Sequence, residues 1–465
     1  MKVERDFFND LVDALDRRTA ALYVGAGLSM GSNFPDWRRL LSDFAEDIGL
    51  DVAREQDLPT LAQFYLNRYS NNRGHLAQVI RSTFQRTAEV SENHRILARL
   101  PFGHVWTTNY DELLERAWEL HGQRLDVKSR NADLTTSDPE AEAILYKMHG
   151  TAGHPDEIVL TKDDYELYAK SRPGFLQILG SDLITRTFLF LGLSFTDPNL
   201  SYLMGLLRAS FLNAPRPHYA VLRRPPESYD AKRFEHFTAD LQRYGIRTLA
   251  VDDFKDIPGV LAKLERRFAQ RNVFVSGSFP ENGDPADHEL ISEVARGVGR
   301  LVARRGLNLI SGFGRVVGTG VVSGTIDELS QLPGSALARR LTIRPIREIS
   351  PEGLSLDEFK RRQREDMISQ AGIVLFIGGL RQGAAARGVM QEFEIAQDKQ
   401  KIILPIAATG HASRQIHEQL LADPSRLPPE LDLELFKRLG PETRSVEDIL
   451  KAIDTCLERI QGRRL

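Results

Sequence analysis

The stretch AALYVGAGLS, residues 20–29, decides the fold of the first half of this chain. Its first five residues, Ala20–Val24, are apolar or aromatic and predict a short buried strand. Gly25-Ala26-Gly27 then predicts a turn, and Trp37–Ile48 shows the spacing of a helix. A strand, a glycine turn and a helix form the start of many nucleotide-binding sheets, because glycine allows backbone N–H groups to approach a phosphate closely.

Further segments of the first half predict strands of the same sheet. They are apolar, lie between helical patterns, and comprise Val105–Thr108, Ile144–Met148, Thr187–Leu191 and His218–Leu222. Strands that alternate with helices predict a doubly wound α/β domain with a parallel sheet. The polar, helix-like stretch Leu58–Phe84 predicts a helical insertion that could form a lid over the site.

The second half repeats this plan after a charged helix expected over Val260–Arg271. A strand at Val273 leads into the turn Ser276-Gly277-Ser278, and Leu290–Val302 has helical spacing. Further strands are expected at Leu307–Ser311, Leu341–Pro345, Ile373–Ile377 and Ile402–Ile406. We therefore expect two Rossmann-like doubly wound domains, at residues 1–268 and 269–465.

Composition excludes several classes of function. The 465 residues carry a formal net charge of −3, so nothing indicates a general attraction to nucleic acid or to an anionic membrane. The N-terminus is charged and no apolar run could span a bilayer, which predicts a cytoplasmic protein. The single cysteine, Cys456, excludes both an intrachain disulfide and a cysteine zinc cluster.

Three polar motifs accompany the glycine turn in the first half. Thr107-Thr108-Asn109-Tyr110-Asp111, Lys147-Met148-His149-Gly150 and Gly192-Leu193-Ser194-Phe195-Thr196-Asp197 each follow a predicted strand. The carboxyl ends of parallel strands converge at one edge of a sheet, where ligands bind. We therefore expect these motifs to meet there, although Asn109 alone could be a turn residue and a lone histidine is often structural.

Together, the four motifs, with Pro35-Asp36-Trp37, resemble the NAD+ pocket of sirtuins and sirtuin-like NAD hydrolases over residues 15–250. The resemblance implies that Asn109 positions the nicotinamide ribose and an attacking water, and that His149 binds or deprotonates a ribose hydroxyl or that water. It implies no metal and no cofactor beyond NAD+ as substrate. The residues it places along the dinucleotide are Gly25, Ala26, Gly27, Ser29, Pro35, Asp36, Thr108, Asp111, Gly192, Ser194 and Asp197.

Sirtuin protein deacylases typically carry a four-cysteine zinc ribbon beside the peptide cleft, which this chain cannot form with Cys456 alone. Water is therefore the expected acceptor, and hydrolysis to nicotinamide and ADP-ribose the expected reaction. Two alternatives stay open: a protein deacylase without zinc, and a nucleotide-binding scaffold without catalysis.

Glycine turns also follow the strands of the second half, which resembles the SLOG family over residues 270–465. Enzymes related to that family have a compact Gly-Gly-x-Gly-Thr-x-x-Glu motif. Here residues 380–387 separate Gly378-Gly379 from Gly388, and Val389 replaces the threonine, which favours a nucleotide sensor. We expect Arg364 at the start of a helix. The expected signal-binding residues are Gly277, Ser278, Gly312, Gly314, Arg364, Gly378, Gly379, Arg381, Glu392 and Glu394, with Arg387 as a further candidate.

The pairing of these two halves resembles the effectors of the bacterial Thoeris anti-phage system. The resemblance implies that a partner protein with a TIR domain makes a cyclic ADP-ribose isomer, which binds the SLOG half and activates depletion of cellular NAD+. It also implies a homo-oligomer, often a tetramer in that family, as the assembly on which such a switch acts.

Overall fold

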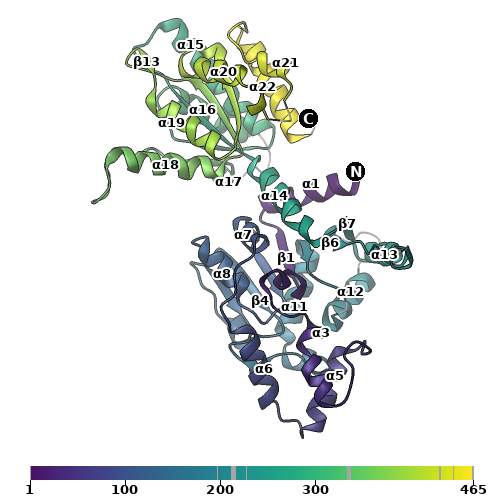
Figure 1. Ribbon diagram of the computed structural model, residues 1–465. Helices are drawn as coiled ribbons and strands as arrows, with labels where there is room; N and C mark the ends of the chain where they lie inside the picture. Colours follow the sequence, from purple (N-terminus) through teal and green to yellow (C-terminus); the bar gives the residue numbers. More distant parts are fainter. Residues whose placement is uncertain are drawn as a thin grey trace. The chain divides into compact units, whose positions relative to one another are not determined.

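The computed structural model describes residues 2–195, 197–210, 216–226, 228–331, 337–428, 431–443 and 445–462. The chain divides into two compact units, Met1–Glu265 and Arg266–Leu465. Each unit is an α/β structure built on a parallel sheet, which confirms the expected fold class (Figure 1). The functional division between residues 268 and 269 stays a prediction. None of the described helices is both long and apolar enough to cross a membrane.

The sheet of the first unit has seven strands among the described residues, and every neighbouring pair is parallel. In order across the sheet they are β3 (Leu125–Lys128), β4 (Ala143–Lys147), β2 (His104–Thr107), β1 (Ala20–Val24), β5 (Thr187–Leu191), β6 (His218–Arg223) and β7 (Ile246–Val251). The five strands expected from the sequence are confirmed. The two edge strands, β3 and β7, were not expected.

The strands after β1 lie on both sides of it: β2 is its neighbour on one side and β5 on the other. The direction in which the chain adds strands to the sheet therefore reverses at β1. Such a reversal opens a crevice at the carboxyl ends of the strands on either side. The glycine turn follows β1, and the three polar motifs follow β2, β4 and β5; these four strands are consecutive neighbours in the sheet. The topology therefore brings them to one edge.

Helices cover both faces of the first sheet. On one face, α11 packs in a core cluster with Tyr23, Trp106 and Phe188, while α1 packs against β1, β5 and β7. The helices are α1 (Lys2–Asp16), α2 (Ala26–Ser29), α3 (Trp37–Leu40), α4 (Ser42–Asp47), α5 (Leu58–Arg68), α6 (Gly74–Phe84), α7 (Glu92–Arg99), α8 (Leu113–Leu120), α9 (Lys162–Glu166), α10 (Tyr168–Ser171), α11 (Pro173–Thr185), α12 (Pro198–Ser210), α13 (Ser228–Leu241) and α14 (Ile257–Ala269).

One helical expectation needs correction, and the helical insertion expected at residues 58–84 is confirmed with a break inside it. The single helix expected over Trp37–Ile48 is wrong, because the chain breaks at Leu41 into α3 and α4. The insertion at residues 58–84 holds two helices, α5 and α6, whose connection includes Ser70 and Asn71 with positive φ. Isolated residues in the left-handed region end a helix, and the run of polar residues there gave no apolar period that marked the break.

The second sheet is built in the same way around β8. Strands β9 and β10 lie on one side of it, and strands β11 and β14 lie on the other. Its order is β10 (Leu341–Ile343), β9 (Asn308–Ser311), β8 (Asn272–Ser278), β11 (Ile373–Gly378) and β14 (Ile402–Ile406). All five were expected. The segment inserted after Gly379 forms a hairpin of β12 (Leu380–Arg381) and β13 (Ala384–Ala385), with Gln382 and Gly383 both at positive φ.

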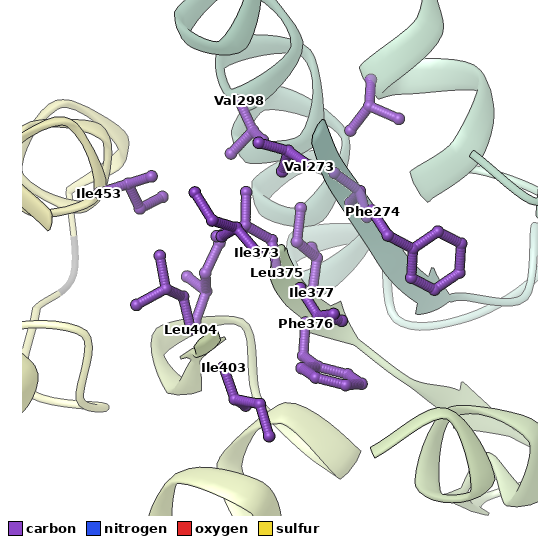
Figure 2. Close-up of a cluster of buried hydrophobic side chains, with 14 of the residues drawn as sticks. Val273, Phe274, Val298, Ile373, Leu375, Phe376, Ile377, Ile403, Leu404 and Ile453 are labelled. Atoms are coloured by element: carbon purple, nitrogen blue, oxygen red, sulfur yellow. The ribbon is translucent and has the colours of Figure 1, made fainter. Parts of the chain in front are cut away.

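Side chains from this sheet and its helices form one apolar core. Figure 2 shows Val298 of α15 beside Val273, and Ile453 of α22 on the same cluster. Phe376 packs edge-on against Phe393 of α19. The helices are α15 (Pro285–Arg304), α16 (Val317–Gln331), α17 (Leu337–Arg340), α18 (Leu356–Gln370), α19 (Arg387–Asp398), α20 (His411–Ala422), α21 (Leu433–Lys437) and α22 (Val446–Gln461).

Helices α15 and α16 cross so closely that glycine is required at the contact. A Cβ atom on Gly299 would overlap the carbonyl oxygen of Val321, and one on Gly324 would overlap that of Arg296. We predict that Gly299→Ala lowers the free energy of unfolding of this unit by about 1–3 kcal/mol, because the helices must move apart. The change is measured by unfolding both proteins in increasing urea and monitoring hydrogen exchange in peptides that cover α15.

The control is Gly259→Ala in α14, where an added Cβ would meet no atom within 4 Å. Alanine is a better helix former than glycine, so this variant should gain up to about 1 kcal/mol. Equal effects of the two substitutions would contradict the steric explanation.

Candidate functional site

Asn109 occupies the centre of a buried hydrogen-bond network beyond β2. Its Nδ2 donates to the carbonyl oxygen of Gly25 at 3.2 Å and to Ser29 Oγ at 2.9 Å. Ser29 Oγ in turn donates to Asp111 Oδ2 at 2.8 Å. Because both hydrogens of the amide are used, its orientation is determined and Oδ1 faces away as an acceptor. Among the described residues no donor reaches this buried Oδ1, and Asn109 as a whole is only 7% exposed.

A buried ion pair supports the loop that carries this network. Lys147 Nζ, at the end of β4, donates to the carbonyl oxygen of Asp111 and to Glu115 Oε1, the latter at 2.7 Å. Burial raises the pKa of Glu115, and the Lys147 ammonium opposes that rise. The ammonium therefore connects the Asp111 backbone to α8 and holds the position of Asn109.

His149 is fully buried and enclosed by aromatic rings. Its ring centroid lies 5.4 Å from that of Tyr165, 6.3 Å from Tyr168 and 6.5 Å from Trp37. Burial lowers the pKa of His149, and the nearby Asp197 carboxylate opposes this effect. Burial therefore favours the neutral imidazole, which is the form that can accept a proton.

The glycines after β1 bring two backbones together. The N–H groups of Gly25 and Gly27 donate to the carbonyl oxygens of Leu191 and Gly192, at 2.9 and 3.1 Å. A Cβ on Gly25 would overlap Gly192, which itself has φ +67°. These two N–H groups are therefore used within the protein, and glycine is required here for the approach of the β1 and β5 ends. Whether the turn also lines a dinucleotide stays a prediction.

Two of the expected acidic residues cap helices at this edge. Asp36 Oδ1 accepts from the Arg39 N–H at 2.8 Å at the start of α3, just after Pro35. Asp197 Oδ1 accepts from the Leu200 N–H at 3.0 Å at the start of α12. Both carboxylates thereby have a structural role that the family resemblance did not assign to them.

The remaining expected residues lie around this centre. Thr108 is half-buried directly before Asn109, Ser194 is exposed in the loop after β5, and Ala26 begins the four-residue helix α2. Thr196, part of the same motif, lies outside the described residues. No three His, Cys, Asp or Glu side chains in the described ranges form a group that could hold a metal ion.

Sequence reasoning missed several residues that shape the site. Trp37 and Lys147 belong to quoted motifs but were given no role, because a motif does not show which way its side chains point. Glu115 and Tyr165 lie in helices α8 and α9, distant in sequence from the histidine and asparagine motifs. Only the packing of these helices over the sheet edge reveals them.

At the matching edge of the second unit, glycine turns again meet. A Cβ on Gly277 would overlap the Ile377 carbonyl oxygen, and the Gly379 N–H donates to the Ser278 carbonyl oxygen at 2.9 Å. Gly314 lies beside them, since its Cβ would be 3.1 Å from the Gly277 oxygen. The turns containing Gly312 and Gly314, Gly277 and Ser278, and Gly378 and Gly379 follow β9, β8 and β11, which are neighbours in the sheet.

A polar network lies beside these turns. Arg364 donates to Glu392 Oε1 at 3.2 Å and to Gln391 Oε1 at 2.8 Å, and Ser276 Oγ donates to Glu392 Oε2. Burial raises the pKa of Glu392, whereas Glu394 is exposed. The expectation that Arg364 starts a helix is wrong, because it lies in the middle of α18.

The other two expected arginines are exposed. Arg381 belongs to the short strand β12, and the Arg387 side chain is 92% exposed at the start of α19. The structure thus gathers Arg364 and Glu392 at the second sheet edge and leaves Glu394 and Arg387 on the surface.

Comparisons with known proteins agree with this two-part organisation. Residues 103–249 match the SIR2-like domain family, and residues 256–460 match the Sir2- and TIR-associating SLOG family. The chain is 36% identical to the NAD(+) hydrolase ThsA of Bacillus cereus strain MSX-D12, over 97% of each chain. It is 33% identical to the protein of the same name in Enterococcus faecium, over 96% of this chain and 98% of the relative.

The Lys147–Glu115 pair makes a testable prediction about stability. Lys147→Met keeps most of the side-chain volume but removes the cation, which leaves Glu115 without its partner. We predict a loss of about 3 kcal/mol in the free energy of unfolding of the first unit, measured by chemical denaturation.

Adding Glu115→Leu to that variant should restore most of the loss, because it removes the unpaired carboxylate. The exposed pair of Lys162 and Glu166, 3.9 Å apart, provides the control. Lys162→Met should change stability by less than about 1 kcal/mol. A similar loss at both lysines would show that the buried pair has no special role.

Proposed function

Because this chain belongs to the ThsA family of NAD(+) hydrolases, we propose that Asn109 and His149 of its SIR2-like unit hydrolyse NAD+ to nicotinamide and ADP-ribose. The protein is an NAD+ glycohydrolase of the Thoeris effector type. The observation that carries the assignment of residues is the Asn109 network. It uses both amide hydrogens internally and leaves one buried acceptor free.

Cleavage of the bond between nicotinamide and ribose develops positive charge on the ribose ring. The electron pair of that bond leaves with nicotinamide, and the oxygen of a water molecule bonds to the same ribose carbon. An acceptor held in place can orient the attacking water or a ribose hydroxyl, and it stabilises the positive charge. Asn109 Oδ1 fits this task because Ser29 and Gly25 prevent the amide from rotating.

The reaction of NAD+ with water releases one proton besides nicotinamide and ADP-ribose. His149 fits the role of its first acceptor, because burial favours its neutral form and neither ring nitrogen has an aligned hydrogen bond among the described residues. The proton passes to solvent after product release. NAD+ is thus the substrate, and this route needs no additional cofactor.

The two alternative functions have weaker support. A deacylase would need a peptide cleft, and the lone Cys456 cannot build the zinc ribbon that typically helps to form one. Cys456 is buried in α22, and burial raises its thiol pKa to about 12. A scaffold without catalysis would not need a buried asparagine with a free acceptor and a buried histidine at the same sheet edge.

The second unit is proposed to bind the signal that activates hydrolysis. Its match to a SLOG family described as Sir2- and TIR-associating supports a cyclic ADP-ribose isomer made by a TIR-domain partner. Glycine turns and Arg364 at one sheet edge suit a phosphate-bearing ligand. In this proposal a homo-oligomer, such as a tetramer, acts in the cytoplasm and depletes NAD+ during phage infection. The signal activates only by binding the active state more tightly than the resting state.

Asn109→Ala tests the catalytic assignment. The substitution removes the free acceptor, and we predict a fall in NAD+ hydrolysis of at least about 100-fold, on the scale of losing one aligned polar group in an active site. NAD+, nicotinamide and ADP-ribose are measured by chromatography. An acyl-lysine peptide assay in parallel detects O-acyl-ADP-ribose, the product expected of the deacylase alternative.

Asn72→Ala is the matched control, because Asn72 is exposed and accepts only a local N–H bond from Gly74. It should retain the rate of the unchanged protein. Unchanged turnover in Asn109→Ala would move catalysis elsewhere in the chain.

Arg364→Ala tests signal binding. NAD+ loss is measured against the concentration of each member of a panel of cyclic ADP-ribose isomers. We predict that the half-maximal concentration of the active isomer rises at least about tenfold, because a charge-assisted contact to phosphate is lost.

Arg362→Ala on the same helix is the control, since Arg362 is 59% exposed and pairs with Glu358. Thermal denaturation of both variants shows whether the fold is kept. An unchanged concentration dependence in a folded Arg364→Ala variant would exclude this arginine from the signal site.

A further inference from the structure

Asp197 and His149 come from strands on opposite sides of β1 in the first sheet. His149 follows β4, whereas Asp197 follows β5, and two other strands lie between these in the sheet. The Asp197 Oδ2 atom nevertheless lies 3.3 Å from His149 Nε2. This is an ion-pair distance without the alignment of a hydrogen bond, which is common for catalytic groups before substrate binds.

The two carboxylate oxygens of Asp197 have different tasks. Oδ1 accepts from the Leu200 N–H and caps α12, a helix of 13 residues. Oδ2 faces the imidazole and also accepts from the Tyr165 hydroxyl at 3.4 Å. The helix cap fixes the carboxylate, and its second oxygen is left to act on the histidine.

We propose that Asp197 is a positioning residue for hydrolysis: it holds the proton of His149 on Nε2, so that Nδ1 is the atom that accepts the proton from water. A carboxylate beside one ring nitrogen favours a hydrogen on that nitrogen, and the other nitrogen then carries the lone pair. This inference rests on the proposed function. It assigns Asp197 to the histidine, where the sequence resemblance assigned it to the dinucleotide.

In the step itself, the water oxygen bonds to the ribose carbon as the bond to nicotinamide breaks. One water proton moves to Nδ1, and the resulting imidazolium is stabilised by Asp197. No oxidant or further reactant is needed. Among the described residues no donor or acceptor aligns with Nδ1, so that nitrogen is available for this transfer.

The other charged and polar groups near His149 bind partners other than its ring. Asp164 pairs with Arg73 at 2.8 Å. Arg172 donates to the carbonyl oxygens of Ser129 and Glu157, and its cation lowers the pKa of His149. The Tyr168 hydroxyl donates to the Met148 carbonyl oxygen. Asp197 therefore provides the main carboxylate contact of the ring, and it opposes the effects of burial and of Arg172 on the pKa.

Asp197→Asn tests the proposal in the full-length protein, at the isomer concentration that gives the unchanged protein its highest rate. Asparagine still caps α12, but its NH₂ group can donate to Nε2 and so moves the histidine proton to Nδ1. We expect kcat to fall at least about 100-fold with KM within about threefold. Asp197 raises the pKa of His149. In the variant, the low-pH side of the pH–rate profile (its acid limb) should therefore move to lower pH.

Asp432→Asn is the matched control, because Asp432 Oδ1 also caps a helix, α21, by accepting from the Leu435 N–H at 2.7 Å. Its kcat and acid limb should equal those of the unchanged protein. Nitrogen-15 spectra of the imidazole, assigned with His149→Gln, give a second readout independent of turnover. They should show an unprotonated Nδ1 in the unchanged protein and a protonated Nδ1 in Asp197→Asn.

The outcomes separate this inference from the proposed function. If His149→Ala abolishes hydrolysis while Asp197→Asn keeps its rate, acid limb and tautomer, the positioning role is overturned and the catalytic assignment stands. If His149→Ala and Asn109→Ala both hydrolyse NAD+ at the unchanged rate, the proposed site is overturned. If turnover is too low to measure, the tautomer in the nitrogen-15 spectra decides the role of Asp197.

Discussion

The contact between the backbone turns after β1 and β5 is the constraint on which the first site depends. Gly25 and Gly192 approach so closely that neither can carry a side chain. This approach presents the Gly25 carbonyl oxygen to Asn109 and sets the start of the loop that brings Asp197 to His149. A larger residue at either glycine would separate the strand ends and displace both groups together. The glycines therefore act through geometry even where their N–H groups are used within the protein.

Most polar groups behind the site satisfy one another, although Glu115 Oε2 has no hydrogen-bond partner among the described residues. Ser29 and Asp111 are bound to each other, and Lys147 neutralises Glu115 behind them. Buried polar atoms in native proteins are rarely unpaired, because each costs roughly 1–3 kcal/mol. The free acceptor of Asn109 and the unaligned nitrogens of His149 are exceptions to that rule. In the proposed function, a bound water or NAD+ supplies their partners and recovers part of this free energy on binding.

The sequence predicted the central strands and the sheet edge where the motifs meet, because buried parallel strands leave a clear apolar signal. It missed β3 and β7, whose sequences are partly polar since edge strands are less covered. The motifs identified Asn109 and His149 but not the direction of the neighbouring side chains. Asp197 and Tyr165 meet His149 through chain folding alone, and no spacing rule contains that information. Assignment of Asp36 as a helix cap, by contrast, was accessible from its place before Trp37.

The second sheet uses the same close approach of strand ends but treats its polar groups differently. Arg364 is already held by Glu392 and Gln391, and Ser276 donates to the same carboxylate. A phosphate that takes Arg364 as its partner must replace these contacts, and the carboxylate of Glu392 must then be protonated or find another donor. Burial raises the pKa of Glu392, which makes protonation easier. A phosphate-bearing ligand of the kind proposed for this edge therefore gains only the difference between its own contacts to Arg364 and those that it replaces.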